Sequence, residues 1–151
     1  MSEAVSAKGM LLSGVPHAGA IGLHVVEIAE THALTRLPYR ADLVGNPDTG
    51  VLHGGVITAL LDNTCGMAVA AKSGKMGQIA TLDLRIDYMK PATPGEDVHA
   101  LAVCYKVTSN IAFVRGTAYH TDKADPIATC AAAFMLGTKS QPGANLAPKD
   151  S

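Results

Sequence analysis

A histidine, two glycines and an aspartate near the middle of the chain are the residues that could do chemistry. His53-Gly54-Gly55 stands at the start of an apolar segment, and Asp62 follows Gly54 by eight residues. Glycines in the first turn of a helix expose backbone N–H groups that the helix cannot satisfy, and the helix dipole favours negative charge there. Such a turn could stabilise an oxyanion, and a carboxylate could act as base or nucleophile.

Each feature also has a purely structural interpretation. The glycines would permit a tight corner between loop and helix, with His53 as a capping group, and Asp62 would pair with a neighbour or reach solvent. Taken alone, either feature is better explained in this way. Together they carry more information, because eight helical residues rise about 12 Å and Gly54 and Asp62 of one chain cannot contact the same carbonyl. If both are catalytic, two chains related by a two-fold axis must share the site.

The segment that carries these residues predicts one long helix. It begins at about His53 and runs to about Lys72, where a glycine-rich exit with lysine in the last turn ends it. Asp62 is its only carboxylate. A charge among apolar neighbours needs compensation or has a shifted pKa, so we expect a raised pKa and a more reactive carboxylate.

β-branched residues and alternating polarity predict six strands around this helix. They are expected at residues 21–30, 31–37, 79–89, 98–108, 111–121 and 126–137. A loop over residues 39–52 leads into the helix, and hairpin-sized connections separate the last three strands. This order predicts an α+β fold with an antiparallel sheet packed on one helix. We expect one domain over residues 16–138, between a loose N-terminal segment 1–15 and a flexible tail 139–151.

Composition excludes several classes of partner. A net charge of -1 and a pI near 6.6 provide no basic surface for nucleic acid or an anionic membrane. Two Phe, four Tyr and no Trp leave little aromatic surface for stacking bases. Small, partly apolar ligands are the expected partners.

Other chemistries lack their motifs. The six histidines are widely spaced and no Cys-x-x-Cys occurs, so we expect neither a metal nor another cofactor. There is no Gly-x-Ser-x-Gly elbow, and Gly74-Lys75 lacks the first glycine of a phosphate loop.

The cysteines and the apolar runs predict a cytoplasmic protein. Cys65, Cys104 and Cys130 have the contexts of reduced core residues, and no signal peptide is visible. No apolar run is expected to span a membrane, since the longest candidate, Ile127 to Leu136, has about half the length required.

Two motifs together resemble a known family. They are His53-Gly54-Gly55-x6-Asp62 and Thr81-x-Asp83-x-Arg85-Ile86-x-Tyr88-Met89-Lys90-Pro91-Ala92. The pair looks like the hotdog-fold acyl-CoA thioesterases, in particular the subfamily that includes the phenylacetate-pathway thioesterases and human thioesterase superfamily member 2. The resemblance covers residues 20 to 138 approximately and is specific for the fold and subfamily, not for the substrate.

The resemblance implies a hotdog fold that hydrolyses an acyl- or aryl-CoA to free acid and coenzyme A. Such proteins form homodimers with a continuous sheet, and often homotetramers. By this likeness Asp62 is the nucleophile or general base, and the Gly54 N–H polarises the thioester carbonyl. Thr81 positions the water or carboxylate, and His53 buttresses the loop and the carbonyl.

The resemblance also implies residues that bind coenzyme A. They are Gly55, Asp83, Tyr88, Lys90, Pro91, Lys106, Ser109 and Asn110. Lys90 and Lys106 could meet phosphates through charge-assisted hydrogen bonds. A solvated surface position explains either lysine equally well.

One departure and two other functions stay open. Relatives commonly place Asn or Gln six residues before the histidine, where this chain has Pro47, with Asn46 one residue earlier. Either Asn46 takes that role or the helper is missing. A non-catalytic acyl-CoA-binding module would share the helix and lysines but would not need Asp62. A hotdog hydratase or dehydratase is less favoured, because its His and Asp motif is not seen.

Overall fold

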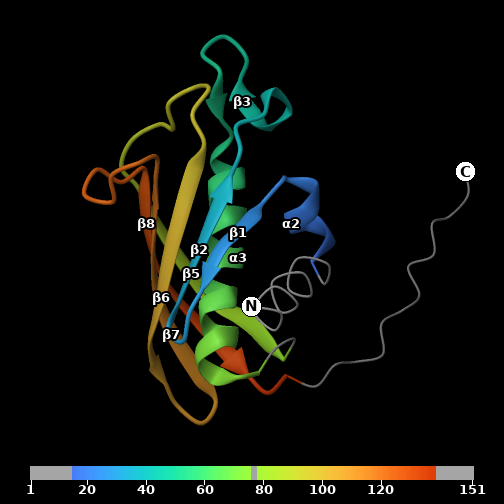
Figure 1. Ribbon diagram of the computed structural model, residues 1–151, viewed down its shortest axis with the longest axis vertical. Helices are drawn as coiled ribbons and strands as arrows, with labels where there is room; N and C mark the ends of the chain where they lie inside the picture. The colour runs from blue at the N-terminus through green and yellow to red at the C-terminus, as the bar shows by residue number, and fades with distance from the viewer. Residues whose placement is uncertain (1–14, 76–77, 139–151) are drawn as a thin grey trace, which may run out of the picture.

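Six strands form one antiparallel sheet that lies along a single long helix (Figure 1). The computed structural model describes residues 15–75 and 78–138. Its elements are α2 (Pro16–Ala20), β1 (His24–Ile28), β2 (His32–Leu37), the 3-10 turn η1 (Ala41–Leu43), β3 (Val44–Asn46), β4 (Val51–Leu52), α3 (Gly54–Ser73), β5 (Ile79–Tyr88), β6 (Val98–Val107), β7 (Ile111–Tyr119) and β8 (Ala128–Leu136). The strand order is β1-β2-β6-β7-β8-β5 and every neighbouring pair is antiparallel. The predicted α+β fold is confirmed.

The differences from the predicted elements lie before α3. The short helix α2 was not predicted, because five residues show no helical periodicity; it and the turn at Gly22 (φ 78°) delay the first strand to His24. The predicted loop 39–52 contains a small hairpin of β3 and β4. The exit from α3 at Gly74 is as predicted, with left-handed φ of 69°. The predicted loose segments, apart from Val15, lie outside the described residues.

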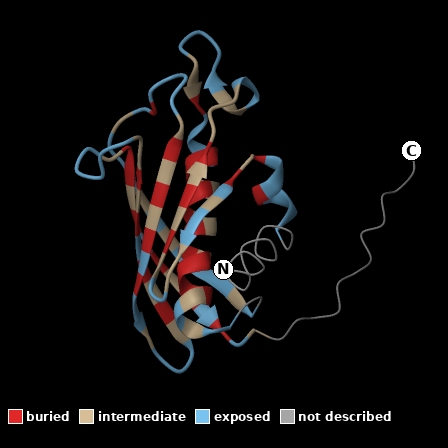
Figure 2. Cartoon of the chain, in the orientation of Figure 1, coloured by how far each residue is buried: buried red, intermediate tan, exposed pale blue. Residues whose placement is uncertain are grey.

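Helix α3 lies along the inner face of the sheet, and buried residues recur along both the helix and the central strands (Figure 2). Leu60, Leu61 and Val69 of α3 are fully buried. Half of the buried hydrophobic residues of strands β6, β7 and β8 are alanine: Ala100, Ala102, Ala112, Ala118, Ala128 and Ala132. At Gly116 of β7 a Cβ atom would lie 3.3 Å from the Cys65 sulfur of α3 and 2.8 Å from the Cys130 sulfur of β8, so both elements approach this backbone closely. All three cysteines are buried and free, as predicted.

The prediction that no apolar segment has the length to span a membrane is wrong for helix α3. Within the described residues it is long and apolar enough to cross a membrane by length and composition. A search for continuous apolar runs does not find this helix, because α3 includes Thr58, Asp62 and Asn63. More than half of this segment is buried within the fold, which is typical of a core helix.

Candidate active site

The side chain of His53 caps the first turn of α3. Its Nδ1 accepts the Gly55 N–H at 2.8 Å, and its carbonyl accepts the Val56 N–H at 3.0 Å. A neutral ring that accepts at Nδ1 carries its proton on Nε2. The Gly54 N–H makes no hydrogen bond within residues 15–75 and 78–138. Two glycine N–H groups were predicted to be exposed. That of Gly55 donates to His53, and that of Gly54 has no acceptor among the described residues.

The β3–β4 hairpin fixes the position of His53. The His53 N–H donates to the Leu43 carbonyl at 2.9 Å. A Cβ atom at Gly45 would lie 2.9 Å from the His53 Cα, so only glycine fits there. Asn46 does not hydrogen-bond to His53 in the described structure, since its Oδ1 accepts the Asp48 N–H at 3.0 Å. The role of Asn46 stays a prediction.

Tyr88, at the end of strand β5, hydrogen-bonds to the first turn of α3. Its hydroxyl donates to the Gly54 carbonyl at 2.9 Å and lies 2.6 Å from the Thr58 hydroxyl. Thr58 was missed in the sequence, although its position four residues after Gly54 places it on the same helix face. These contacts hold the backbone of Gly54 between β5 and α3.

Asp62 pairs with Thr81, as the motif suggested. The Thr81 hydroxyl donates to Asp62 Oδ1 at 2.9 Å. Asp62 is half-buried and lies with Ala59, Asn63 and Gly66 on a partly exposed stripe of α3 beside strand β5, at the edge of the sheet. The expectation that apolar groups surround the carboxylate is therefore not met within one chain, because the apolar neighbours in sequence point to other faces of the helix.

A β-bulge lets β5 present both Thr81 and Tyr88 to α3. The register against β8 shifts between Thr81, opposite Phe134, and Asp83, opposite Ala133. In a regular strand an odd and an even position face opposite sides of the sheet. The extra residue at Leu82 puts both hydroxyls on the helix side.

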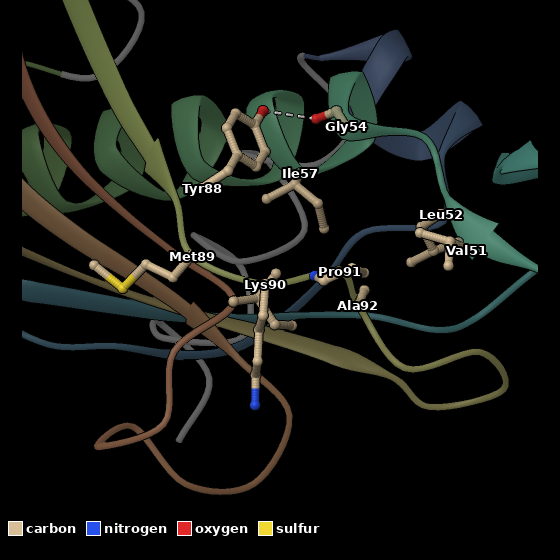
Figure 3. A pocket seen from close by; sticks show the side chains of 10 residues that line it. Val51, Leu52, Gly54, Ile57, Tyr88, Met89, Lys90, Pro91 and Ala92 are labelled. Carbon is tan, nitrogen blue, oxygen red and sulfur yellow. Dashed lines mark hydrogen bonds between the residues drawn. The ribbon is translucent and has the colours of Figure 1, made fainter.

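A pocket of about 390 Å³ opens beside Gly54 (Figure 3). Its walls are mostly apolar: Val51, Leu52, Gly54, Ile57, Tyr88, Met89, Lys90, Pro91, Ala92 and Ile127. Figure 3 shows the Lys90 amine directed away from the helix, where it forms an ion pair with Asp125. Asp62 is not among the lining residues. One chain thus places Gly54, whose N–H is open, in the wall of the pocket, and the Asp62 carboxylate lies about two turns further along α3.

The predicted coenzyme A residues do not gather in one chain. Tyr88, Lys90 and Pro91 lie at one end of the sheet, since Tyr88 pairs with Ala128. Lys106 pairs with Phe113 near the opposite end, beside the turn of Ser109 and Asn110 (Figure 1). The Asp83 side chain is exposed on β5. The Gly55 N–H already donates to His53 Nδ1.

Two other chemistries are disfavoured by the geometry. Cys65 lies one turn after Asp62, but a hydrogen bond with Cys130, together with burial, holds the pKa of its thiol far above the usual value. It is therefore no thiolate nucleophile at neutral pH. No group of three or more His, Cys, Asp or Glu that could hold a metal occurs in the described residues.

Comparison with known proteins identifies the family. The thioesterase superfamily matches residues 49–127, which include the α3 start, Asp62 and all of β5. The chain belongs to the thioesterase superfamily. This confirms the resemblance drawn from the two motifs.

Relatives of this superfamily cover most of the chain. It is 25% identical over 141 residues to the medium/long-chain acyl-CoA thioesterase YigI of Escherichia coli, an alignment that spans 85% of this chain and 90% of YigI. A crystal structure of a Pseudomonas aeruginosa protein is 46% identical, with a TM-score of 0.76 over 83% of this chain and 93% of that chain. The phenylacetic acid degradation protein PaaI of Thermus thermophilus is 26% identical, with a TM-score of 0.71 over 81% and 99% of the two chains. The hotdog architecture is confirmed.

Proposed function

We propose that this protein is an acyl-CoA thioesterase that hydrolyses a thioester to a free acid and coenzyme A. The observation that carries the proposal is the Gly54 N–H, unpaired among the described residues at the wall of an apolar pocket. A donor at a helix N-terminus can stabilise the negative charge that develops on a thioester oxygen. The acyl-CoA thioesterase YigI supports this choice of substrate class.

A two-fold dimer would complete the site. Strand β5 is an edge strand, and no described strand pairs with its outer side. Leu82, Tyr88 and Met89, on or beside it, are 49%, 52% and 55% exposed. A long edge strand with exposed apolar side chains is a template for pairing with another chain. We place the dimer contact here, with two β5 strands antiparallel in one continuous sheet.

This arrangement would join groups that one chain keeps apart. With the two-fold axis near the middle of β5, the Tyr88 end of one strand lies beside the Thr81 end of the other. Gly54 is bonded to Tyr88, and Asp62 to Thr81. The axis therefore brings the Gly54 N–H of one chain toward Asp62 of the partner subunit. It also brings Lys90 of one chain toward the end of the sheet that carries Lys106 in the other.

Each group then has a separate role. The Gly54 N–H binds the thioester oxygen, and the His53 ring, which accepts the Gly55 N–H at Nδ1, holds the same turn in place. Asp62 of the partner subunit either attacks the carbonyl carbon, to form a mixed anhydride that water then hydrolyses, or removes a proton from a water that attacks directly. Both routes consume one water and release the thiol of coenzyme A. Thr81 holds one carboxylate oxygen, so the other faces the substrate.

A non-catalytic acyl-CoA-binding module is the second candidate, and the Asp62–Thr81 pair favours the enzyme over it. We expect the protein to act in the cytoplasm, where reducing conditions keep its three free cysteines as thiols. A homotetramer remains a prediction that native mass spectrometry can check.

The test is thiol release from a panel of acyl- and aryl-CoA substrates by the parent and by Asp62→Asn. We expect turnover by the parent and a fall in kcat of more than about 100-fold in the variant, which keeps the shape of Asp62 and an acceptor for Thr81. Isothermal titration with coenzyme A is made beside this assay. Binding of coenzyme A without thiol release by the parent would favour the binding module, whereas thiol release favours the enzyme. Activity of Asp62→Asn within a few fold of the parent would make Asp62 structural.

A further inference from the structure

The segment between β5 and β6 forms one wall of the pocket beside Gly54. We call residues Met89 to Asp97 the β5–β6 loop; its first four residues line the pocket. The Met89 and Lys90 N–H groups donate to the Ile127 carbonyl at 2.8 and 3.3 Å. Beyond Ala92 the loop leaves the sheet and turns at Gly95 (φ 81°). The pocket wall therefore needs a second attachment after Ala92.

His120, at the end of strand β7, provides that attachment. Its Nε2 accepts the Thr93 N–H at 2.9 Å, and its Nδ1 lies 2.8 Å from the Asp97 carbonyl, to which it donates. Thr93 directly follows the pocket wall and Asp97 directly precedes β6. The side chain is 11% exposed. One largely buried imidazole thus bonds the middle and the end of the same loop.

His120 is itself held rigidly. Its carbonyl accepts the Nδ1–H of His99 at 2.7 Å, and the His99 ring stacks on Tyr119. The Asp97 carboxylate accepts the Tyr39 N–H at 3.0 Å and pairs with Arg36 at 2.9 Å. The loop and the β7–β8 connection lie side by side at one end of the sheet (Figure 1). An imidazole fixed in this way can set the position of the loop.

We propose that His120 is a positioning residue for substrate binding. It does not line the pocket beside Gly54, and it acts by holding Thr93 and thus the wall formed by Met89, Pro91 and Ala92. The identity of the substrate rests on the proposed acyl-CoA thioesterase function. A role in fold stability alone would predict lower stability without a change in substrate binding.

Three substitutions at His120 separate these roles. His120→Gln can place an amide oxygen at the position of Nε2 and keep the bond to Thr93. His120→Asn can place an amide nitrogen at the position of Nδ1 and keep only the bond to Asp97. His120→Ala removes both. His32→Ala is the matched control, because His32 bonds to Glu27 near the β1–β2 turn and has no contact with the β5–β6 loop.

The measurements are kcat and KM for the best substrate of the panel, thermal unfolding, and hydrogen exchange at the Thr93 amide. We expect KM to rise about tenfold in His120→Ala and His120→Asn, as for the loss of one hydrogen bond of about 1.4 kcal/mol, with kcat changed less than about threefold. Thr93 should lose protection in the same two variants. His120→Gln and the control should keep KM and protection near the parental values.

Each outcome decides the proposal. If His120→Ala fails to fold, a higher KM and a less protected Thr93 amide in His120→Asn than in His120→Gln still support the proposal. Equal KM in the Gln and Asn variants, or unchanged Thr93 protection in the Asn variant, overturns it. If the parent hydrolyses no acyl-CoA, the proposed function fails, whereas hydrogen exchange still shows whether His120 holds the loop.

Discussion

The Thr81 hydroxyl donates to the Asp62 carboxylate across 2.9 Å, from strand β5 to helix α3. This bond fixes the direction of Oδ1 of the carboxylate, and in the proposed reaction the other oxygen would face the substrate. The arrangement supports a positioning role for Thr81 rather than direct participation in the reaction.

Removing the Thr81 hydroxyl should reduce kcat while the fold is kept. We expect Thr81→Val, which keeps the branched shape, to lower kcat by about 10 to 100-fold, because Asp62 loses its orientation. Thr81→Ser is the control and should stay close to the parent. Equal kcat values for Thr81→Val and Thr81→Ser would show that the Thr81 hydroxyl has no role in the reaction.

The shared site can be tested by mixing two inactive variants. Gly54→Pro removes the open N–H at a position where the first turn of a helix accepts proline, and Asp62→Ala removes the carboxylate. A mixed dimer has one site with both groups intact. Co-refolding equal amounts should restore roughly a quarter of parental activity, since about half the dimers are mixed and each has one working site of two.

Gly54→Ala is the control for that experiment. Its Cβ would lie 3.8 Å from the Tyr88 ring, an ordinary contact, and the N–H is kept, so it should retain activity. Native mass spectrometry must show that mixed dimers form. If they form without activity, Gly54 and Asp62 do not meet across the interface.

The two lysines predicted to meet phosphates should affect substrate binding more than turnover. Lys90→Ala and Lys106→Ala, made together, should raise KM for acyl-CoA several fold, with a smaller change in kcat. Added salt should have the same effect on the parent, because exposed charge contacts are screened. Lys123→Ala, which removes the same charge elsewhere, should leave KM unchanged; a KM indifferent to the double substitution would place the phosphates elsewhere.

The close approach of α3 to the sheet at Gly116 should tolerate no added methyl group. Gly116→Ala places a Cβ 2.8 Å from the Cys130 sulfur and 3.3 Å from the Cys65 sulfur. We expect the free energy of unfolding to fall by about 1–3 kcal/mol, measured by urea denaturation. A second substitution, Cys130→Ala, should recover part of the loss. Gly19→Ala, where no atom lies within 4 Å, is the neutral control.

Local patterns in the sequence predicted helix α3, the strands of the large sheet and the candidate reacting groups. The apolar run after His53 predicted α3, and alternating polarity predicted the strands of the large sheet, because both depend on the spacing of neighbouring residues. Helical rise alone separated Gly54 from Asp62 and required a second chain if both act. The motifs predicted the family that the comparisons identified.

Tertiary contacts decided which of these groups are available. The bulge at Leu82 brings Thr81 and Tyr88 to one face, and it depends on the pairing of β5 with β8. The cap by His53 uses the Gly55 N–H and leaves that of Gly54 open. The sheet buries the apolar faces of α3, whereas Asp62 lies on a partly exposed stripe beside edge strand β5, where Thr81 donates to it. Such relationships join residues distant in sequence, or depend on which side-chain rotamer the surrounding packing allows, so local spacing does not contain them.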